Sequence, residues 1–210
     1  MSVGDQPGTS RRTALGQGQK ERELLACVAL RDDAAFAELY ALYHRRLARF
    51  LRRFTARYDV IEEIINDTMW VVWRKCADFR GDSLVSTWVM GIAYRRAMKT
   101  LQYLSATSPS GPRSGNLQEA VAENLQGDAE LQDWLQVALA RLPLEQRMAL
   151  ELTYFLGHSC EEVALIMDCP ANTVKTRMFH GRAKLRNLLP ALAGQMAAES
   201  VSAPVTHYEQ

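Results

Sequence analysis

The stretch SCEEVALIMDCPANTVKTRMFHGRAKL, residues 159–185, decides the fold of the C-terminal part of the chain. Ser159 is a suitable N-cap for a short helix, and Asp168-Cys169-Pro170 ends that helix. A second helix then begins at Pro170 and Ala171, because proline is tolerated in a first helical turn. Two short helices joined by a tight turn, the second of them basic, are typical of a helix-turn-helix motif.

The second helix of this motif carries segregated positive charge. Between Cys169 and Ala198 there are five Lys or Arg residues and no acidic residue. A recognition helix enters the major groove, where Asn, Arg and Thr contact base edges while Lys and Arg neutralise phosphates. The alternative is an amphipathic basic helix whose charged face is only solvated. We expect DNA contacts from Asn172, Thr173, Lys175, Thr176, Arg177, Phe179, His180, Arg182 and Lys184.

Apolar residues recur at helical spacing along most of the remaining chain. Asp32 or Asp33 is a suitable N-cap for one helix, and Gly157 a suitable stop for another. No alternation typical of strands is present in the sequence. The predicted helices start near Glu21, cover residues 33–57, 61–72 and 85–103, start again near Leu131 and cover residues 145–155.

The predicted fold class is all-α, with two small helical domains joined by a flexible acidic linker. Ser105–Gly115 contains Ser-Pro-Ser-Gly-Pro, which breaks helices, and residues 1–19 carry few apolar side chains. The expected boundaries are a disordered tail over residues 1–19, a helical bundle over 20–104, a linker over 105–129, a helix-turn-helix domain over 130–192 and a tail over 193–210.

The 210 residues have a formal net charge of +1, but charge is unevenly distributed along them. Residues 44–57 hold six Arg, whereas residues 114–140 hold five acidic residues and no Lys or Arg. Segregation of this kind points to surfaces that face polyanions. Two interpretations of the acidic stretch stay open: an extended tether, or a mimic of nucleic acid that lies against the basic helix in the free protein.

Several functional classes are disfavoured. The four cysteines are not spaced as C-x-x-C, so we expect no metal site and no cofactor, and we interpret them as small buried side chains in a reducing compartment. The N-terminus lacks an apolar signal core, and no run of about eighteen apolar residues occurs. We therefore expect a cytoplasmic protein that is not inserted in a membrane.

Two sets of motifs occur in a fixed order along the chain. The C-terminal set is Leu142-Pro143, Gln146-Arg147, Gly157, Ser159, Glu161-Glu162-Val163-Ala164 and Asn172-Thr173-Val174-Lys175-Thr176-Arg177. The N-terminal set is Phe36-Ala37-Glu38-Leu39-Tyr40, Glu63-Ile64-Ile65-Asn66-Asp67-Thr68, Val72-Trp73, Phe79-Arg80-Gly81-Asp82-Ser83 and Thr87-Trp88-Val89-Met90-Gly91-Ile92-Ala93. Together they resemble regions 4 and 2 of the extracytoplasmic-function (ECF) sigma factors of bacterial RNA polymerase, over roughly residues 130–190 and 20–104.

The resemblance implies a role for each set of residues. The helix around residues 62–70 would dock on the clamp coiled coil of core RNA polymerase, although an ordinary solvated helix face would have a similar pattern. The docking residues would be Glu62, Glu63, Asn66, Asp67 and Trp70. The helix-turn-helix would bind the minus-thirty-five promoter element.

The resemblance also implies that the loop at residues 79–83 and the helix behind it contact the minus-ten element, whose unstacked bases suit an aromatic and basic lining. The contacts would come from Phe79, Arg80, Ser83, Tyr94, Arg95, Arg96 and Lys99. Many family members have Asn soon after the Ile-Ala pair, where this chain has Tyr94-Arg95-Arg96. We expect Arg95 or Arg96 to bind phosphate instead, and we interpret Trp88 as a core residue.

The function implied is that of a sigma factor in the bacterial cytoplasm. It would bind core RNA polymerase, double-stranded promoter DNA and the melted minus-ten strand, and an anti-sigma factor would regulate it. It would direct promoter recognition and transcription initiation without catalysing a reaction. One alternative is a helix-turn-helix regulator that does not dock on polymerase. The other is an enzyme that uses His158 with Cys160, or the pair Glu161-Glu162, although a helix cap explains these residues.

Overall fold

The computed structural model describes the backbone over residues 7–107 and 129–201, and side chains over residues 16–107 and 135–190. Within these ranges every regular element is a helix, as the sequence predicts. The elements are α1 (Pro7–Ala29), α2 (Asp33–Leu51), α3 (Tyr58–Lys75), the short 3-10 helix η1 (Cys76–Asp78), α4 (Val85–Thr107), α5 (Ala129–Ala140), α6 (Leu144–Tyr154), α7 (Cys160–Met167) and α8 (Ala171–Val201).

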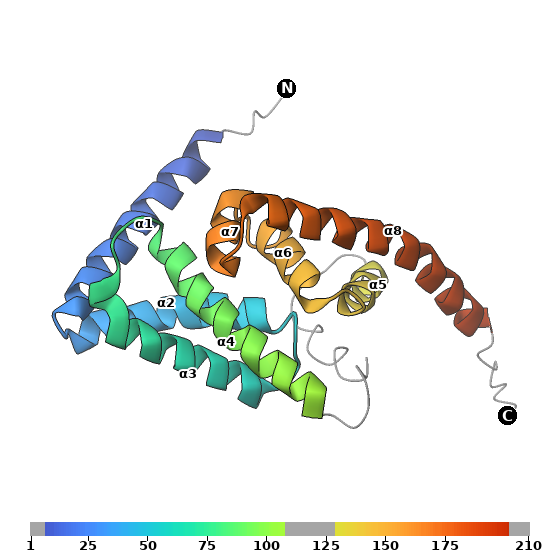
Figure 1. The fold of residues 1–210 in the computed structure, drawn as a ribbon, viewed down its shortest axis with the longest axis horizontal. Helices are drawn as coiled ribbons and strands as arrows, with labels where there is room; N and C mark the ends of the chain where they lie inside the picture. The colour runs from blue at the N-terminus through green and yellow to red at the C-terminus, as the bar shows by residue number, and fades with distance from the viewer. Residues whose placement is uncertain (1–6, 108–128, 202–210) are drawn as a thin grey trace, which may run out of the picture.

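Helices α1 to α4 form the N-terminal half of the molecule (Figure 1). Helices α2 and α3 each bury one apolar stripe, which is why the helical spacing in the sequence predicts them correctly. In α4 the six consecutive residues 89–94 are all buried, because this helix packs against α3 on one side and α7 on another. Asp32 caps α2, since its carboxylate accepts hydrogen bonds from the backbone N–H groups of Ala34 and Ala35 at 2.9 and 3.0 Å. The fully buried side chains at the centre include Leu39, Tyr43, Leu47, Ile61, Ile64, Ile65 and Met69.

Helices α5 to α8 form the C-terminal half, in which α7 and α8 make the helix-turn-helix. Ser159 caps α7 in a capping box: its Oγ accepts from the N–H of Glu162 at 3.1 Å, and the Glu162 carboxylate accepts from the N–H of Ser159 at 2.8 Å. The turn after α7 places Asp168 in the left-handed region, with φ of 51°. The predicted cap and the predicted break before Pro170 are both confirmed.

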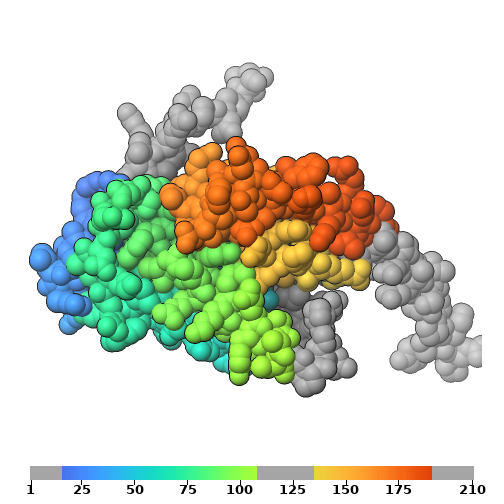
Figure 2. Space-filling model, in the orientation of Figure 1, coloured from blue at the N-terminus to red at the C-terminus, as the bar shows by residue number. Residues whose placement is uncertain are grey.

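The two halves pack directly against one another. Figure 2 shows the C-terminal half lying along α4, and α7 is the helix that meets α4. Gly91 on α4 lies so close to α7 that a Cβ atom added to it would be 3.6 Å from the carbonyl oxygen of Ile166. One continuous apolar cluster therefore includes residues of both halves.

Two expected tails are helical in the parts that the structure describes. Helix α1 begins at Pro7, so residues 7–19 are not the predicted disordered tail, and α8 continues past residue 193 to Val201. Once packing has nucleated a helix, adding each further residue costs little free energy. The apolar content of a segment therefore does not predict whether a neighbouring helix extends into it. In α1 the packing comes from Leu25 and Val28, which are buried in the core, and from Glu21, which is buried and accepts a hydrogen bond from the hydroxyl of Tyr43 on α2. The predicted linker falls almost wholly on residues 108–128, which lie outside the described part of the chain.

The cysteines only partly match the expectation of small buried side chains. Cys76 is buried, Cys160 and Cys169 are half-buried, and Cys27 is exposed, because it falls on the outer face of α1. No helix in the described part of the chain is long and apolar enough to cross a membrane.

Candidate functional site

The five residues predicted to bind core polymerase all lie on α3, on the side away from its buried stripe. We call Glu62, Glu63, Asn66, Asp67 and Trp70 the docking face. Glu62 is half-buried and the other four are exposed; Trp70 has 59% of its surface exposed, which is unusual for so large an apolar side chain.

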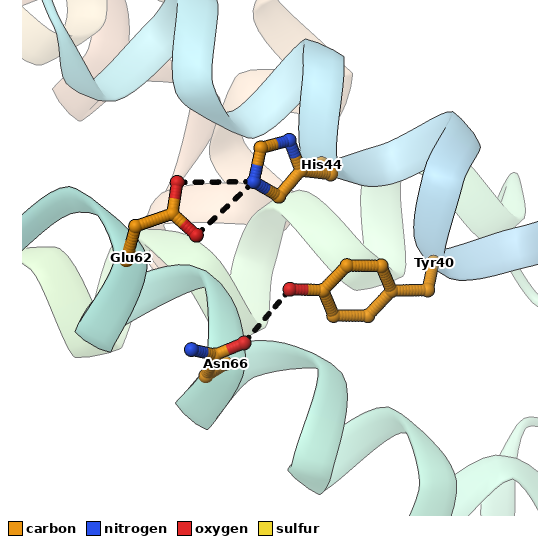
Figure 3. A network of polar contacts seen from close by, with 4 residues as sticks. All are labelled: Tyr40, His44, Glu62 and Asn66. Carbon is orange, nitrogen blue, oxygen red and sulfur yellow. Dashed lines mark hydrogen bonds and ion pairs between the residues drawn. The ribbon is translucent and has the colours of Figure 1, made fainter. Parts of the chain in front are cut away.

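Two residues of α2 orient part of the docking face, as Figure 3 shows. The hydroxyl of Tyr40 donates a hydrogen bond to Oδ1 of Asn66 at 2.8 Å. The Nε2 atom of His44 lies 3.0 and 3.1 Å from the two carboxylate oxygens of Glu62. Sequence reasoning missed both roles and assigned Tyr40 to the apolar stripe of its helix. The available signal was the spacing of four residues, which puts both side chains on one edge of α2.

The charge of Glu62 on α3 affects the ionisation of Tyr40 on α2. Partial burial raises the pKa of the Tyr40 phenol, and the negative charge of Glu62 adds to the rise. At the other end of the face, the Asp67 carboxylate lies 3.6 Å from a guanidinium nitrogen of Arg96 on α4. The docking face is thus held from both sides, by α2 and by α4, which favours a fixed geometry in the free protein.

The loop predicted to contact the minus-ten element leads into α4. Gly81 adopts φ of +80°, which favours glycine at this turn. Phe79 is half-buried with its ring centroid 5.4 Å from that of Trp88, and Trp88 itself packs against the core, as predicted. Arg80 is exposed and lies 3.5 Å from Asp82. Ser83 donates a hydrogen bond to the carbonyl of Leu84 at 3.2 Å.

Tyr94 does not match its predicted place on a DNA surface. Only 6% of it is exposed, because α4 is covered here by the C-terminal half. Burial raises the pKa of its phenol, and the nearby charge of Glu145 on α6 adds to the rise. In this arrangement of the two halves Tyr94 is covered by protein, and its predicted contact with the minus-ten element stays a prediction. Its neighbours Arg95 and Lys99 are exposed, and Arg96 is half-buried beside Asp67.

Most residues predicted to bind the minus-thirty-five element share the outer face of α8. Phe179 is 61% exposed, with its ring centroid 5.5 Å from that of His180. Arg182 donates a hydrogen bond to the hydroxyl of Tyr154 at 3.0 Å. Thr173 differs from most of the set because it is half-buried. The exposed members of the set are Asn172, Lys175, Thr176, Phe179, His180, Arg182 and Lys184.

Arg177 is the exception on α8, because its side chain is turned toward the protein. Its guanidinium forms an ion pair with Glu145 of α6 and donates to Sγ of Cys169, 3.4 Å away. Its side chain is only 21% exposed. A base contact by Arg177 requires it to leave Glu145 first.

The Arg-rich block over residues 44–57 is divided between solvent and protein contacts, and its exposed members are Arg45, Arg49, Arg52 and Arg57. Arg46 donates to the buried carboxylate of Glu21 at 2.7 Å, and Arg57 pairs with Asp59 at 2.6 Å. Arg53 reaches across to the C-terminal half and pairs with Glu151 of α6. Charge density along a sequence does not distinguish arginines that face DNA from those that pair with acids.

A buried charge cluster joins the two halves, and the sequence reasoning missed it. It consists of Arg53, Arg147 and Glu151. Glu151 is fully buried; its burial raises the pKa of the carboxyl, while Arg53 and Arg147 act against that rise. Burial lowers the pKa of Arg147 to about 10. The available signal was a charged residue within the apolar stripe that includes Met148 and Leu152.

The residues that the enzyme alternative would use have structural roles at the start of α7. Ser159 and Glu162 form the cap of α7, and the imidazole of His158 is half-buried beside Glu162, at 3.8 Å from its carboxylate. Cys160 is the first residue of that helix and packs against the core. No catalytic arrangement is needed to explain this segment.

Comparison with known proteins identifies both halves independently. The family model "Sigma-70 region 2" matches residues 39–106, and "Sigma-70, region 4" matches residues 132–185. The ECF RNA polymerase sigma-E factors of Salmonella typhimurium and Escherichia coli are 31% identical over 172 residues, which is 77% of this chain and 90% of theirs. The protein of the same name from Haemophilus influenzae is 30% identical over 187 residues, or 82% of this chain and 96% of its own.

Two solved structures share the fold. The structure of CnrH in complex with the cytosolic domain of CnrY matches with a TM-score of 0.62 and 23% identity, over 82% of this chain and 98% of that one. The sigma factor RpoE of Bartonella quintana, in complex with the anti-sigma factor NepR, matches with a TM-score of 0.55 and 24% identity, over 74% and 96%.

Proposed function

The chain belongs to the ECF group of RNA polymerase sigma factors, and from this premise we propose which of its surfaces carry out the function of that family. A sigma factor binds core RNA polymerase, recognises the promoter and directs transcription initiation. Sigma factors are not a class of enzymes. We infer that this chain contributes binding surfaces rather than a reaction, and that it acts in the bacterial cytoplasm, where the polymerase is.

The docking face on α3 is the proposed contact with core polymerase. Its exposed carboxylates and the exposed ring of Trp70 combine charge with a large apolar anchor, a combination typical of residues that dominate protein interfaces. Orientation by Tyr40 and His44 before binding lowers the entropy lost on docking. We therefore add these two residues of α2 to the proposed surface as positioning residues.

The loop at residues 79–83 and α4 are the proposed reader of the minus-ten element. Phe79 offers an aromatic surface on which an unstacked base can lie, and Arg80, Arg95 and Lys99 are exposed cations for the single-stranded backbone. The exposed basic face of α8 is the proposed reader of the minus-thirty-five element in the major groove. Tyr94 joins the first surface only if the two halves rearrange, and Arg177 joins the second only if it leaves Glu145.

Promoter opening needs the polymerase. Separating about ten stacked steps costs about 14 kcal/mol, at about 1.4 kcal/mol per step. Two small DNA-binding faces are not expected to offset this alone, so binding free energy from the assembled holoenzyme is required. The family also implies an anti-sigma partner, and the Bartonella quintana neighbour is a sigma factor bound to such a protein.

The observation that carries the proposal is the presence, on one chain and in family order, of the docking face and of the basic helix-turn-helix. The test is to mix the purified chain with core RNA polymerase, isolate the complex by size exclusion and measure run-off transcripts from a library of promoters. Co-elution and promoter-dependent transcripts are expected. A chain that binds duplex DNA but neither co-elutes with core enzyme nor initiates transcription would instead be a regulator that works without polymerase.

A further inference from the structure

Helix α4 carries three cations and no acidic residue among its 23 residues. Arg95 and Lys99 are exposed, and neither forms an ion pair with an acidic side chain in the described part of the chain. Arg96 differs, because it is half-buried and its guanidinium lies 3.6 Å from the carboxylate of Asp67. Two of the three cations of this helix are therefore available to a polyanion.

Tyr103 continues the exposed side of α4 toward the C-terminal end of the helix. Residues four apart are neighbours on a helix, so Arg95, Lys99 and Tyr103 form one row about 12 Å long, which we call the α4 row. Tyr103 has 68% of its surface exposed, more than any other Phe, Tyr or Trp that the structure describes. Figure 2 shows the last turns of α4 at the surface of the molecule. The residues that the family resemblance assigns to the minus-ten element end at Lys99, so it gives Tyr103 no role.

The chemistry of the α4 row fits a phosphate backbone. Arg and Lys side chains neutralise phosphates, and a Tyr hydroxyl donates a hydrogen bond to a phosphate oxygen. The hydroxyls of Tyr40 and Tyr43 donate to side chains of the protein. The hydroxyl of Tyr103 has no such acceptor among the residues whose side chains the structure describes, so it is available to a ligand.

The order of elements along the chain gives the α4 row a direction on the promoter. The loop at residues 79–83, before the start of α4, is the proposed reader of melted bases, and the chain after α4 leads to α5 and the helix-turn-helix. The minus-thirty-five element lies upstream of the minus-ten element, and the DNA between them is duplex. We therefore expect the C-terminal end of α4 to lie toward that duplex. At about 3.4 Å per base pair, the row covers about three or four base pairs.

We propose that Tyr103 binds a backbone phosphate of the duplex directly upstream of the minus-ten element, so that the α4 row extends the DNA-binding surface from the melted strand to double-stranded DNA. Arg95 and Lys99 contact the backbone at the minus-ten element, and Tyr103 donates its hydroxyl hydrogen bond farther upstream. Because this contact is to phosphate alone, it adds affinity without sequence preference. The inference rests on the proposed function, which supplies the promoter.

An exposed tyrosine offers DNA two different groups, its hydroxyl and the face of its ring. The ring face serves single strands, because unstacked bases can lie on it. In a duplex the bases are stacked on one another, so the hydroxyl is the group of Tyr103 that can bind there. Tyr103→Phe separates the two chemistries, since it removes the hydroxyl and keeps the ring.

The test changes the protein and the DNA together, in holoenzyme reconstituted from the full chain and core polymerase on a promoter selected by run-off transcription. In the modified DNA, neutral methylphosphonates replace the phosphates of about four base pairs directly upstream of the minus-ten element. On unmodified DNA we expect Tyr103→Phe to lower the affinity about fivefold, because one hydrogen bond to phosphate is lost. On the modified DNA the variant and the parent should bind equally well.

Two further variants locate the effect. Arg95→Ala should lose its effect on affinity when methylphosphonates are placed within the minus-ten element, and keep it when they are placed upstream, because Arg95 is nearer to the loop. Tyr58→Phe removes an exposed hydroxyl from α3, outside the α4 row, and should bind both DNAs as the parent does. Circular dichroism of each free variant should show the helix content of the parent.

Each outcome decides the inference. Parent-like affinity of Tyr103→Phe on unmodified DNA would overturn the contact, and so would a loss of the same size on both DNAs, which would place the effect in the helix. Coupling of Tyr103 to phosphates within the minus-ten element would overturn the upstream direction. A holoenzyme that does not form or does not initiate would refute the proposed function, and with it the promoter as the partner of the α4 row. A parent-like Tyr103→Phe in a holoenzyme that does initiate refutes the inference alone.

Discussion

The hydroxyl of Tyr40 on α2 donates a hydrogen bond to Oδ1 of Asn66 on α3, at 2.8 Å. This bond lies at the surface and joins two helices across the docking face (Figure 3). Together with the contact between His44 and Glu62, it gives α3 a fixed polar edge beside the exposed ring of Trp70. The docking face is therefore a structured surface in the free protein, and its charge can be changed without disturbing the core beneath it.

Reversing the charge of the two exposed carboxylates of the docking face should weaken binding to core polymerase. The double change Glu63→Lys with Asp67→Lys acts on exposed residues outside the buried stripe of α3, so the fold is expected to persist. We expect affinity to fall by about tenfold or more, which corresponds to about 1.4 kcal/mol. The measurement is a binding titration against core enzyme. The control is Glu23→Lys with Asp78→Lys, a double reversal at exposed sites away from the face; equal losses in both would refute the assignment.

On α8, Arg177 and Lys184 should affect DNA binding in different ways. Arg177→Ala in the holoenzyme is expected to cost about 1–3 kcal/mol and to relax specificity at one position of the minus-thirty-five element. Lys184→Ala, at an exposed position later in the helix, should weaken all promoters alike and reduce the salt slope by about one. Affinities across a promoter library at several salt concentrations distinguish the two. Identical profiles for both variants would contradict this division of roles.

His158 should make stability depend on pH. Burial lowers the pKa of its imidazole, Arg46 on α2 lowers it further, and Glu162 on α7 opposes the shift. Glu21 on α1 lines a pocket together with His158 and Arg46. A lowered pKa means that the unfolded chain binds the proton more readily. The stabilisation is thus present above the ordinary value of about 6.5 and is lost as pH falls from there through the lowered pKa.

The test is to measure the free energy of unfolding from neutral pH to about pH 5. His158→Gln should flatten the pH dependence in that window. His180→Gln, at an exposed position on α8, is the control and should leave the dependence unchanged. The same slope in His158→Gln as in the parent would exclude His158 as its source.

The capping box of α7 should contribute measurably to the stability of the helix-turn-helix. Ser159→Ala removes the acceptor for the N–H of Glu162 and is expected to cost about 1 kcal/mol of unfolding free energy. Urea denaturation followed by circular dichroism measures this. Ser105→Ala, at an exposed position within α4, caps no helix and should change stability little. A Ser159→Ala midpoint equal to that of the parent would show that the cap is dispensable.

Periodicity and capping were sufficient to predict much of the architecture. Asp32 and Ser159 cap their helices as predicted, the break before Pro170 is where the helix-turn-helix turns, and Ile64, Ile65 and Met69 are buried while Glu63 and Trp70 are exposed. These features depend on residues within a turn or two of one another, so a helix with one apolar face determines its own inside and outside. The all-α fold followed from that level, whereas the family was indicated by the resemblance of the two sets of motifs to regions 4 and 2 of the ECF sigma factors.

The sequence did not predict which side chains from distant helices contact one another, because the packing of the helices decides this. Tyr94 is buried and Arg53 meets Glu151 because the two halves close on one another, and Arg177 is paired with Glu145 because α8 packs against α6. A helical pattern says that a face is apolar or charged, but it carries no information about which distant helix covers that face. The ends of α1 and α8 escaped prediction for a related reason: a helix already begun continues cheaply through polar residues. Local spacing thus set the elements and their exposed faces, and long-range packing set which functional residues those faces present to solvent.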